Sequence, residues 1–377
     1  MSSSAKAAIT ALAACLLTTA HAKTPALSGP LLLLEASNGR ILYAEDQDHQ
    51  WFPASLTKIM TAYIAFDAIK AGRIAPTDMV TVSENALLQP PSKLGLPVGS
   101  EITVEQALRV LVVKSANDVA VMLAEKIAGN EAAFVALMND TAKRLGMTRT
   151  TFVNPNGLPA AGQVSTARDL ARLGLAALQH FPDHREMWAM SEVQVGQQRL
   201  KSHNELLRTF DGADGIKTGF ICDSGFNVVA SAARDGRRLI AVVLGEPSGR
   251  DRNIRAAALL QHGFDTADWK AAHAAPTIES LPLDRTAPQV VSVRTSVLAW
   301  NCNPRKTAAR KPGNRKRPAA TAGRKQAKPA QATGAVPQQQ PAAKQPVAPA
   351  GKQAVAPAGK QAAGPVPKQP AAAVKKE

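Results

Sequence analysis

Apolar positions along the chain change period, and the change separates predicted helices from predicted strands. Near the start, apolar runs at residues 31–36 and 41–44 flank Ser37-Asn38-Gly39-Arg40. Asn-Gly between two apolar runs is the strongest short signal for a β-hairpin. We therefore expect an antiparallel strand pair, followed by a helix over about residues 54–71, which ends before Gly72.

Helical spacing dominates the middle of the chain. Thr103-Val104-Glu105-Gln106 has the form of a capping box and opens an apolar-periodic stretch. The predicted helices cover residues 108–113, 119–128, 131–145 and 166–178. Ser115-Ala116-Asn117 therefore lies in a link between two buried helices.

Strand-like spacing returns at residues 215–220, 226–233 and 239–245, and a further helix is predicted over residues 254–262. An order of strands, helices and strands favours an α+β fold, in which helices flank an antiparallel sheet, over repeated βαβ units. In such a sheet the first and the last strands pair with each other.

The first 22 residues have the pattern of a secretory signal peptide. Lys6 precedes an apolar run at residues 7–20, and Ala20-His21-Ala22 is a small-x-small cleavage site. The run is too short to span a bilayer, so we expect an exported periplasmic or wall-associated protein that begins near Lys23. A lipoprotein cleavage box before Cys15 is a minor alternative.

Most of the formal net charge of +16 belongs to residues 303–377, which hold sixteen lysines and arginines, one acid and no aromatic residue. A proline-, alanine- and lysine-rich segment of this kind is predicted to be a disordered tail. Without aromatic stacking, its charge does not indicate nucleic-acid binding. It is either a flexible spacer or a contact for anionic wall or membrane polymers.

Before this tail we expect a catalytic domain over residues 23–265 and a short extension over residues 266–302. Two cysteines remain after removal of a signal peptide, Cys222 and Cys302. Their spacing neither supports nor excludes a disulfide. No His and Cys spacing typical of metal ligands is present, and we expect no metal and no other cofactor.

The first candidate for chemistry is Ser55-Leu56-Thr57-Lys58. A step of three residues on a helix places the hydroxyl and the amine on one face. A desolvated lysine can take the proton of a serine and so make it a nucleophile. By itself the pattern also fits a capping serine beside a surface lysine, and Ser3-Ser4-Ala5-Lys6 matches it too.

Two further motifs follow. Ser115 and Asn117 lie between apolar helices, where they can relay a proton and hold a substrate amide, or else cap the next helix. Ser83-Glu84-Asn85 matches the same pattern in polar surroundings. Lys217-Thr218-Gly219 on a strand suits a substrate carboxylate, and the alternative is an ordinary strand with one exposed lysine.

The order Ser-x-x-Lys, Ser-x-Asn, Lys-Thr-Gly resembles the penicillin-recognising serine enzymes, which are the penicillin-binding proteins and the serine β-lactamases. The surrounding residues narrow the resemblance to the low-molecular-mass D-alanyl-D-alanine carboxypeptidases, peptidase family S11. The similar stretches are residues 53–61, 115–118, 165–169 and 214–220, and the resemblance covers about residues 27–265.

This resemblance implies a β-lactamase/transpeptidase-like fold and a peptidase that removes the terminal D-alanine of peptidoglycan stem peptides through an acyl-enzyme. β-Lactams would acylate the same serine. The implied catalytic residues are Ser55, Lys58, Ser115 and Asn117. The implied substrate-binding residues are Lys217, Thr218, Gly219, Phe220 and Arg250, with the N–H groups of Ser55 and Phe220 as the oxyanion hole.

The sequence departs from the family pattern in two places, and other functions remain as alternatives. The family's second, β-rich domain and C-terminal amphipathic helix are not recognised, so no C-terminal membrane anchor is expected. In Ser202-His203-Asn204-Glu205, where relatives often carry an arginine, we expect His203 to be a hydrogen-bonded structural residue. The alternative functions are a D,D-endopeptidase, a β-lactamase and a noncatalytic wall-binding protein. A β-lactamase is disfavoured because residues 154–166 hold no acid.

Overall fold

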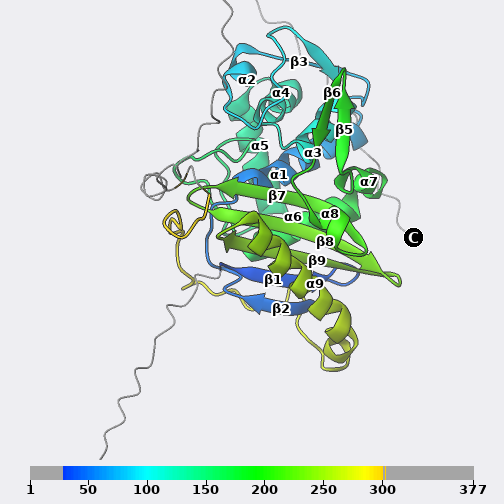
Figure 1. Ribbon diagram of the computed structural model, residues 1–377, viewed down its shortest axis with the longest axis vertical. Helices are drawn as coiled ribbons and strands as arrows, with labels where there is room; N and C mark the ends of the chain where they lie inside the picture. The colour runs from blue at the N-terminus through cyan, green and yellow to red at the C-terminus, as the bar shows by residue number, and fades with distance from the viewer. Residues whose placement is uncertain (1–28, 300–301, 303–377) are drawn as a thin grey trace, which may run out of the picture. The chain divides into compact units, whose positions relative to one another are not determined.

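The computed structural model describes residues 29–299 and residue 302. The predicted signal peptide and the predicted disordered tail lie outside these residues. Within them, the main sheet has five antiparallel strands in the order β2-β1-β9-β8-β7 (Figure 1). Their bounds are Leu31–Glu35 for β1, Ile41–Glu45 for β2, Ala213–Ile221 for β7, Gly225–Arg234 for β8 and Arg237–Glu246 for β9.

In the sheet, the first strand in the sequence pairs with the last one. Leu33 of β1 lies opposite Ala241 of β9, which confirms that the first and last predicted strands are neighbours. Side chains alternate between the two faces, as the strand period requires. Leu32 and Leu34 point into one apolar core, and Leu31 and Leu33 into the other.

Helices cover both faces of the sheet. α9, Gly249–Ala272, packs on one face, and α6, Ala167–His180, packs on the other (Figure 1). α9 continues past residue 265, where we expected the catalytic domain to end. The remaining long helices belong to the α6 side: α1 (Lys58–Lys70), α3 (Val104–Val113), α4 (Asn117–Ala128) and α5 (Glu131–Arg144). The predicted capping box of Thr103 and Gln106 is present at the start of α3.

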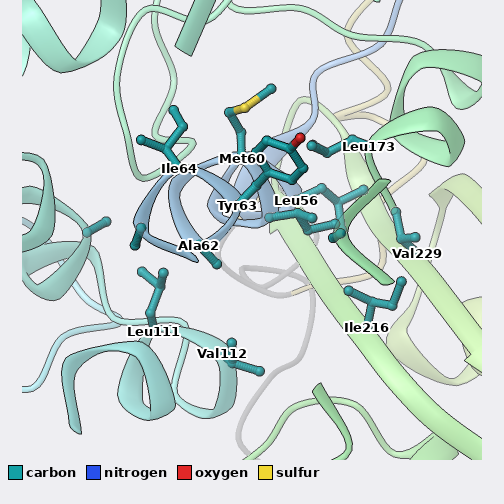
Figure 2. Packing of buried hydrophobic residues seen from close by; sticks show 14 of the residues in the cluster. Leu56, Met60, Ala62, Tyr63, Ile64, Leu111, Val112, Leu173, Ile216 and Val229 are labelled. Carbon is teal, nitrogen blue, oxygen red and sulfur yellow. The ribbon is translucent and has the colours of Figure 1, made fainter. Parts of the chain in front are cut away.

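Helix α1 runs through the centre of this helical layer. Figure 2 shows Leu56, in the turn that leads into α1, on the side of Ile216 and Val229, which belong to the sheet. Ala62 of α1 lies on the side of Leu111 of α3. Apolar residues occur almost all round α1, as expected of a helix that is buried on every side. The start of α1 is therefore held firmly between sheet and helices.

Several short elements were not predicted. A 3-10 turn, η1 (Ala54–Thr57), leads into α1. Two small hairpins are formed by β3 (Met79–Thr81) with β4 (Glu101–Thr103) and by β5 (Glu192–Val195) with β6 (Gln198–Lys201). The short helical pieces are α2 (Glu84–Leu88), η2 (Pro182–His184), α7 (Arg185–Trp188) and α8 (Leu206–Thr209).

The extension after α9 returns across the folded region in irregular conformation. Arg168 of α6 donates to the carbonyl oxygens of Leu281 and Pro282, at 2.7 and 2.8 Å. Cys302 forms a disulfide with Cys222, which settles the pairing that the sequence left open. None of the helices in the described ranges is both long and apolar enough to cross a membrane.

Candidate active site

Ser55 and Lys58 meet at the junction of η1 and α1. The Lys58 Nζ lies 3.1 Å from the Ser55 Oγ, so the predicted pair is in hydrogen-bond contact. Ser55 is partly exposed, whereas Lys58 is almost completely buried. The serine can therefore meet a substrate while the amine stays shielded from water, and the alternative of a surface lysine is excluded.

Burial sets the protonation of Lys58. Desolvation, together with the positive charge of Lys217, lowers its pKa well below the usual range, against the opposing effect of Asp118. The amine also donates to the Asn117 Oδ1 at 2.7 Å and to the carbonyl oxygen of Asn156. These contacts fix the amine beside Ser55 in a site that favours its neutral form.

Ser115 and Asn117 lie on the link between α3 and α4, as predicted. Neither side chain caps α4, so the alternative role for this motif is wrong. Ser115 has a positive φ of 61°, and its buried hydroxyl has no hydrogen-bond partner among the described residues. Both polar atoms of the Asn117 amide are hydrogen-bonded. Its Oδ1 accepts from Lys58, and its Nδ2 donates to the Pro90 carbonyl at 2.8 Å. A buried hydroxyl that has no partner and lines the same cleft as Ser55 is available to a substrate.

A loop over residues 154–158 completes the pocket around Lys58, although its sequence indicates only a turn. At Gly157, which has a positive φ of 84°, an added Cβ would lie 1.9 Å from the Ala54 carbonyl oxygen. Only glycine permits this approach to the backbone next to Ser55. The signal in the sequence was Asn154-Pro155-Asn156-Gly157, whose second asparagine supplies the carbonyl to Lys58.

Strand β7 forms the opposite wall. Lys217 and Thr218 are buried, and the Lys217 Nζ donates to the Thr218 carbonyl at 3.1 Å. An added Cβ at Gly219 would lie 3.0 Å from the Pro53 carbonyl oxygen, so the glycine lets β7 pack against η1. Phe220 follows at this point of contact, and its ring stacks on Phe226 with centroids 4.2 Å apart.

Positive charge gathers beyond the Lys-Thr-Gly motif. Arg250 lines the cleft but is exposed, whereas Arg252 is buried and was missed by the sequence analysis. Burial, with a contribution from Arg252, lowers the pKa of Lys217 to about 7. Burial also lowers the pKa of Arg252 to about 10. Such a cluster of desolvated cations suits a carboxylate.

His203 lies near the same cluster and lines the cleft. Burial and the charges of Lys217, Lys114 and Arg252 lower its pKa. Its carbonyl accepts a hydrogen bond from Arg252 at 3.3 Å, but its ring makes none within the described part of the chain. The hydrogen bond expected of His203 is therefore made by its backbone and not by its ring.

Together these groups line a cleft of about 740 Å³. Ser55, Ser115, Asn117, Thr218 and Gly219 all face it, and Lys58 and Lys217 are buried beside it. The structure thus brings together the three motifs that the sequence singled out. Among the described residues, no group of three His, Cys, Asp or Glu side chains is placed to hold a metal ion. What the cleft offers is a serine hydroxyl in contact with a buried amine, across from the strand that carries Lys217.

A family model described as D-alanyl-D-alanine carboxypeptidase, peptidase family S11, matches residues 18–248. The chain belongs to this family. The resemblance drawn from the three motifs is confirmed, and the match covers the cleft from Ser55 to Lys217.

Curated relatives in the S11 family include D-alanyl-D-alanine carboxypeptidase DacC of Escherichia coli strain K12, 39% identical over 240 residues. DacA of Haemophilus influenzae is 37% identical over 239 residues. These alignments cover 62% of this chain, and 60% and 61% of the two relatives. The chain therefore matches about three fifths of the length of these relatives.

Solved structures agree with the fold. Penicillin-binding protein 5 of Haemophilus influenzae superposes with a TM-score of 0.61 at 36% identity, over 63% of this chain and 71% of that one. Penicillin-binding protein D2 of Listeria monocytogenes, in its ampicillin-bound form, gives a TM-score of 0.59 at 29% identity, over 63% and 97%. The predicted α+β fold of the β-lactamase/transpeptidase type is confirmed.

Proposed function

We propose that this protein is a serine-type D-alanyl-D-alanine carboxypeptidase, which removes the terminal D-alanine of peptidoglycan stem peptides. One observation carries the proposal: the buried Lys58 amine lies 3.1 Å from the Ser55 hydroxyl, and burial lowers its pKa. A neutral amine at this distance acts as the general base that a serine nucleophile requires. A noncatalytic wall-binding protein has no need of such a pair.

The reaction follows from the arrangement of the cleft. Ser55 passes its proton to Lys58 and attacks the carbonyl carbon of the D-Ala-D-Ala bond. The backbone N–H groups of Ser55 and Phe220 stabilise the oxyanion that forms. D-Alanine leaves with a proton, and water then hydrolyses the ester on Ser55 to release the shortened peptide.

Substrate orientation comes from the cationic end of the cleft. Thr218, Lys217 and the buried Arg252 bind the terminal carboxylate, and the exposed Arg250 lies at the rim of the same region. A penicillin carries a carboxylate and a reactive amide carbonyl in an arrangement like that of the D-Ala-D-Ala end of the peptide. It therefore acylates Ser55 and blocks the enzyme.

The setting of the enzyme is also a proposal. Residues 1–22 direct export, so the enzyme works in the periplasm or at the cell wall. The net charge of +15 on residues 303–377 supports contact with anionic wall or membrane polymers through nonspecific electrostatics.

Mass analysis of the products from a pentapeptide ending in D-Ala-D-Ala tests this function. The expected products are free D-alanine and the tetrapeptide, with neither formed by Ser55→Ala. Ser83→Ala is a matched control, because Ser83 caps α2 and does not line the cleft. Cleavage of a cross-linked dimer in preference to the pentapeptide would instead identify an endopeptidase, and no release by the wild type would leave a noncatalytic binder.

A further inference from the structure

The cleft extends beyond the end of β7, away from the cationic cluster. Its lining there includes Cys222 and Asp223, which follow β7, and Arg294, which belongs to the extension after α9. We call these three residues the distal wall. Figure 1 shows the orange part of the extension beside the end of the sheet where β7 leads into β8.

Specific contacts build the distal wall. The Arg294 Nη2 donates to the Asp223 Oδ2 at 2.6 Å, and the Arg294 Nε donates to the Oδ1 at 3.2 Å. Ser292 donates its hydroxyl to the same carboxylate at 2.5 Å, and the Val293 N–H donates to the Asp223 carbonyl at 3.0 Å. The Cys222–Cys302 disulfide joins the two chain segments covalently. The extension is therefore part of the cleft.

A bound stem peptide would run toward this wall. β7 is at one edge of the sheet formed by the described strands, so an extended peptide can lie along it. With the terminal carboxylate at Thr218 and the reacting carbonyl at Ser55, the rest of the peptide continues toward Ile221 and Asp223. At about 3.3 Å per residue, the residue before the two D-alanines lies about 7 Å along β7 from the carboxylate, near Phe220, so a long side chain on it can extend toward the distal wall.

We propose that Asp223 and Arg294 form a subsite for the third residue of the stem peptide, and that they select a side chain carrying both an ammonium and a carboxylate group. This inference rests on the proposed carboxypeptidase activity and names the substrate class of the same cleft. A diamino-dicarboxylic acid such as meso-diaminopimelate has this chemistry, whereas lysine offers the ammonium group alone.

Charge complementarity supports the proposal. Asp223 and Arg294 place an anion and a cation side by side, and their side chains keep 27% and 48% exposure. A zwitterionic group can set its ammonium against the Asp223 carboxylate and its carboxylate against the Arg294 guanidinium. Asp223 and Arg294 already pair with each other, so a zwitterionic side chain adds a contact to each charge, whereas an apolar side chain adds none.

The test compares three pentapeptides that end in D-Ala-D-Ala and differ only in the third residue: meso-diaminopimelate, L-lysine or L-alanine. The measured quantity is the ratio of kcat/KM values between peptides, for the full mature chain. We expect the wild type to prefer the diaminopimelate peptide over the alanine peptide by about fivefold or more, the size of a partly exposed charge contact.

Two variants separate the contributions. Arg294→Gln should abolish the preference for diaminopimelate over lysine, because only diaminopimelate has the second carboxylate. Asp223→Asn should abolish the preference for lysine over alanine. Arg285→Gln, an exposed arginine of the same extension that does not line the cleft, is the matched control and should retain the wild-type ratios.

Equal kcat/KM values for the three peptides with the wild-type enzyme would overturn the subsite while leaving the carboxypeptidase function in place. Ratios that Arg294→Gln and Asp223→Asn both leave unchanged would overturn it as well. Release of D-alanine from none of the peptides would overturn the proposed function itself, and the subsite with it.

Discussion

The proposed mechanism requires opposite protonation states of two buried lysines in the cleft. In it, Lys58 is neutral to accept the proton of Ser55, and Lys217 is charged to bind a carboxylate. Burial lowers the pKa of both, and the charge of Lys217 lowers the pKa of Lys58 further. The order of the two pKa values therefore follows from their environment: a charged Lys217 favours a neutral Lys58.

This arrangement predicts a bell-shaped pH profile of kcat/KM for D-alanine release from the pentapeptide. The profile should rise as Lys58 loses its proton and fall as Lys217 loses its proton near pH 7, its pKa being about 7 in the free enzyme. Lys217→Arg should move the falling limb to higher pH, because a guanidinium group stays protonated. A falling limb at the same pH in this variant would contradict the assignment.

Some individual site residues could be identified from the sequence, and others could not. Ser83-Glu84-Asn85 was set aside because of its polar surroundings, and Ser83 indeed caps α2 by accepting the Ala86 N–H at 3.0 Å. Arg250 was singled out from the sequence and Arg252 was not considered, although Arg252 is the buried one and Arg250 is exposed. Which of two arginines turns inward depends on the phase of the first turn of α9, which no local pattern sets.

At the scale of elements, the loop over residues 154–158 brings the Asn156 carbonyl to Lys58. Gly157 permits this because it has both a positive φ and no Cβ next to the Ala54 carbonyl. The sequence marked the segment as a turn, but a backbone carbonyl leaves no signature in residue type. Its role became visible only once the loop was placed against η1.

Gly157→Ala should therefore lower the rate of Ser55 acylation by penicillin about a hundredfold, the usual effect of displacing a catalytic group by about 1 Å. Gly162→Ala is the matched control, because Gly162 has a φ of 83° in the same region but no atom within 4 Å of an added Cβ. Both variants carry the same backbone strain, so stopped-flow acylation rates isolate the close contact. Equal losses in both would refute the role given to Gly157.

The elements with buried apolar runs were predictable, and the short exposed ones were not. β1, β8 and β9 have extended apolar runs, and α3 has a capping box, so each carries a signal over its whole length. The β5–β6 hairpin consists of four-residue strands with mostly exposed side chains. Such strands depend on tertiary contacts, which local patterns do not record.

At the scale of the molecule, the extension after α9 depends on long-range contacts. Arg168 and Asp48 form a buried ion pair at 2.6 Å, and the same guanidinium binds the backbone of the extension. The Cys222–Cys302 disulfide fixes the far end of the extension beside the cleft. The positions of Cys222 and Cys302 alone could not predict this path, because the two cysteines are 80 positions apart in the sequence.

Deletion of residues 305–377 tests the proposed role of the basic tail. Cys302 remains, so the disulfide and the cleft are retained. We expect an unchanged rate of D-alanine release from soluble pentapeptide and a lower retention on isolated cell walls at low salt, because nonspecific charge contacts are screened by ions. Retention equal to that of the full chain would leave the tail as a spacer only.

The central claim is that Ser55 is the nucleophile, and one measurement tests it directly. After reaction with a penicillin, a tryptic digest is analysed by mass spectrometry for the peptide over residues 41–58, which contains Ser55 and ends at Lys58. The account predicts a penicilloyl adduct on Ser55 of this peptide and no adduct anywhere in Ser55→Ala. An adduct on another residue, or one that persists in Ser55→Ala, would contradict it.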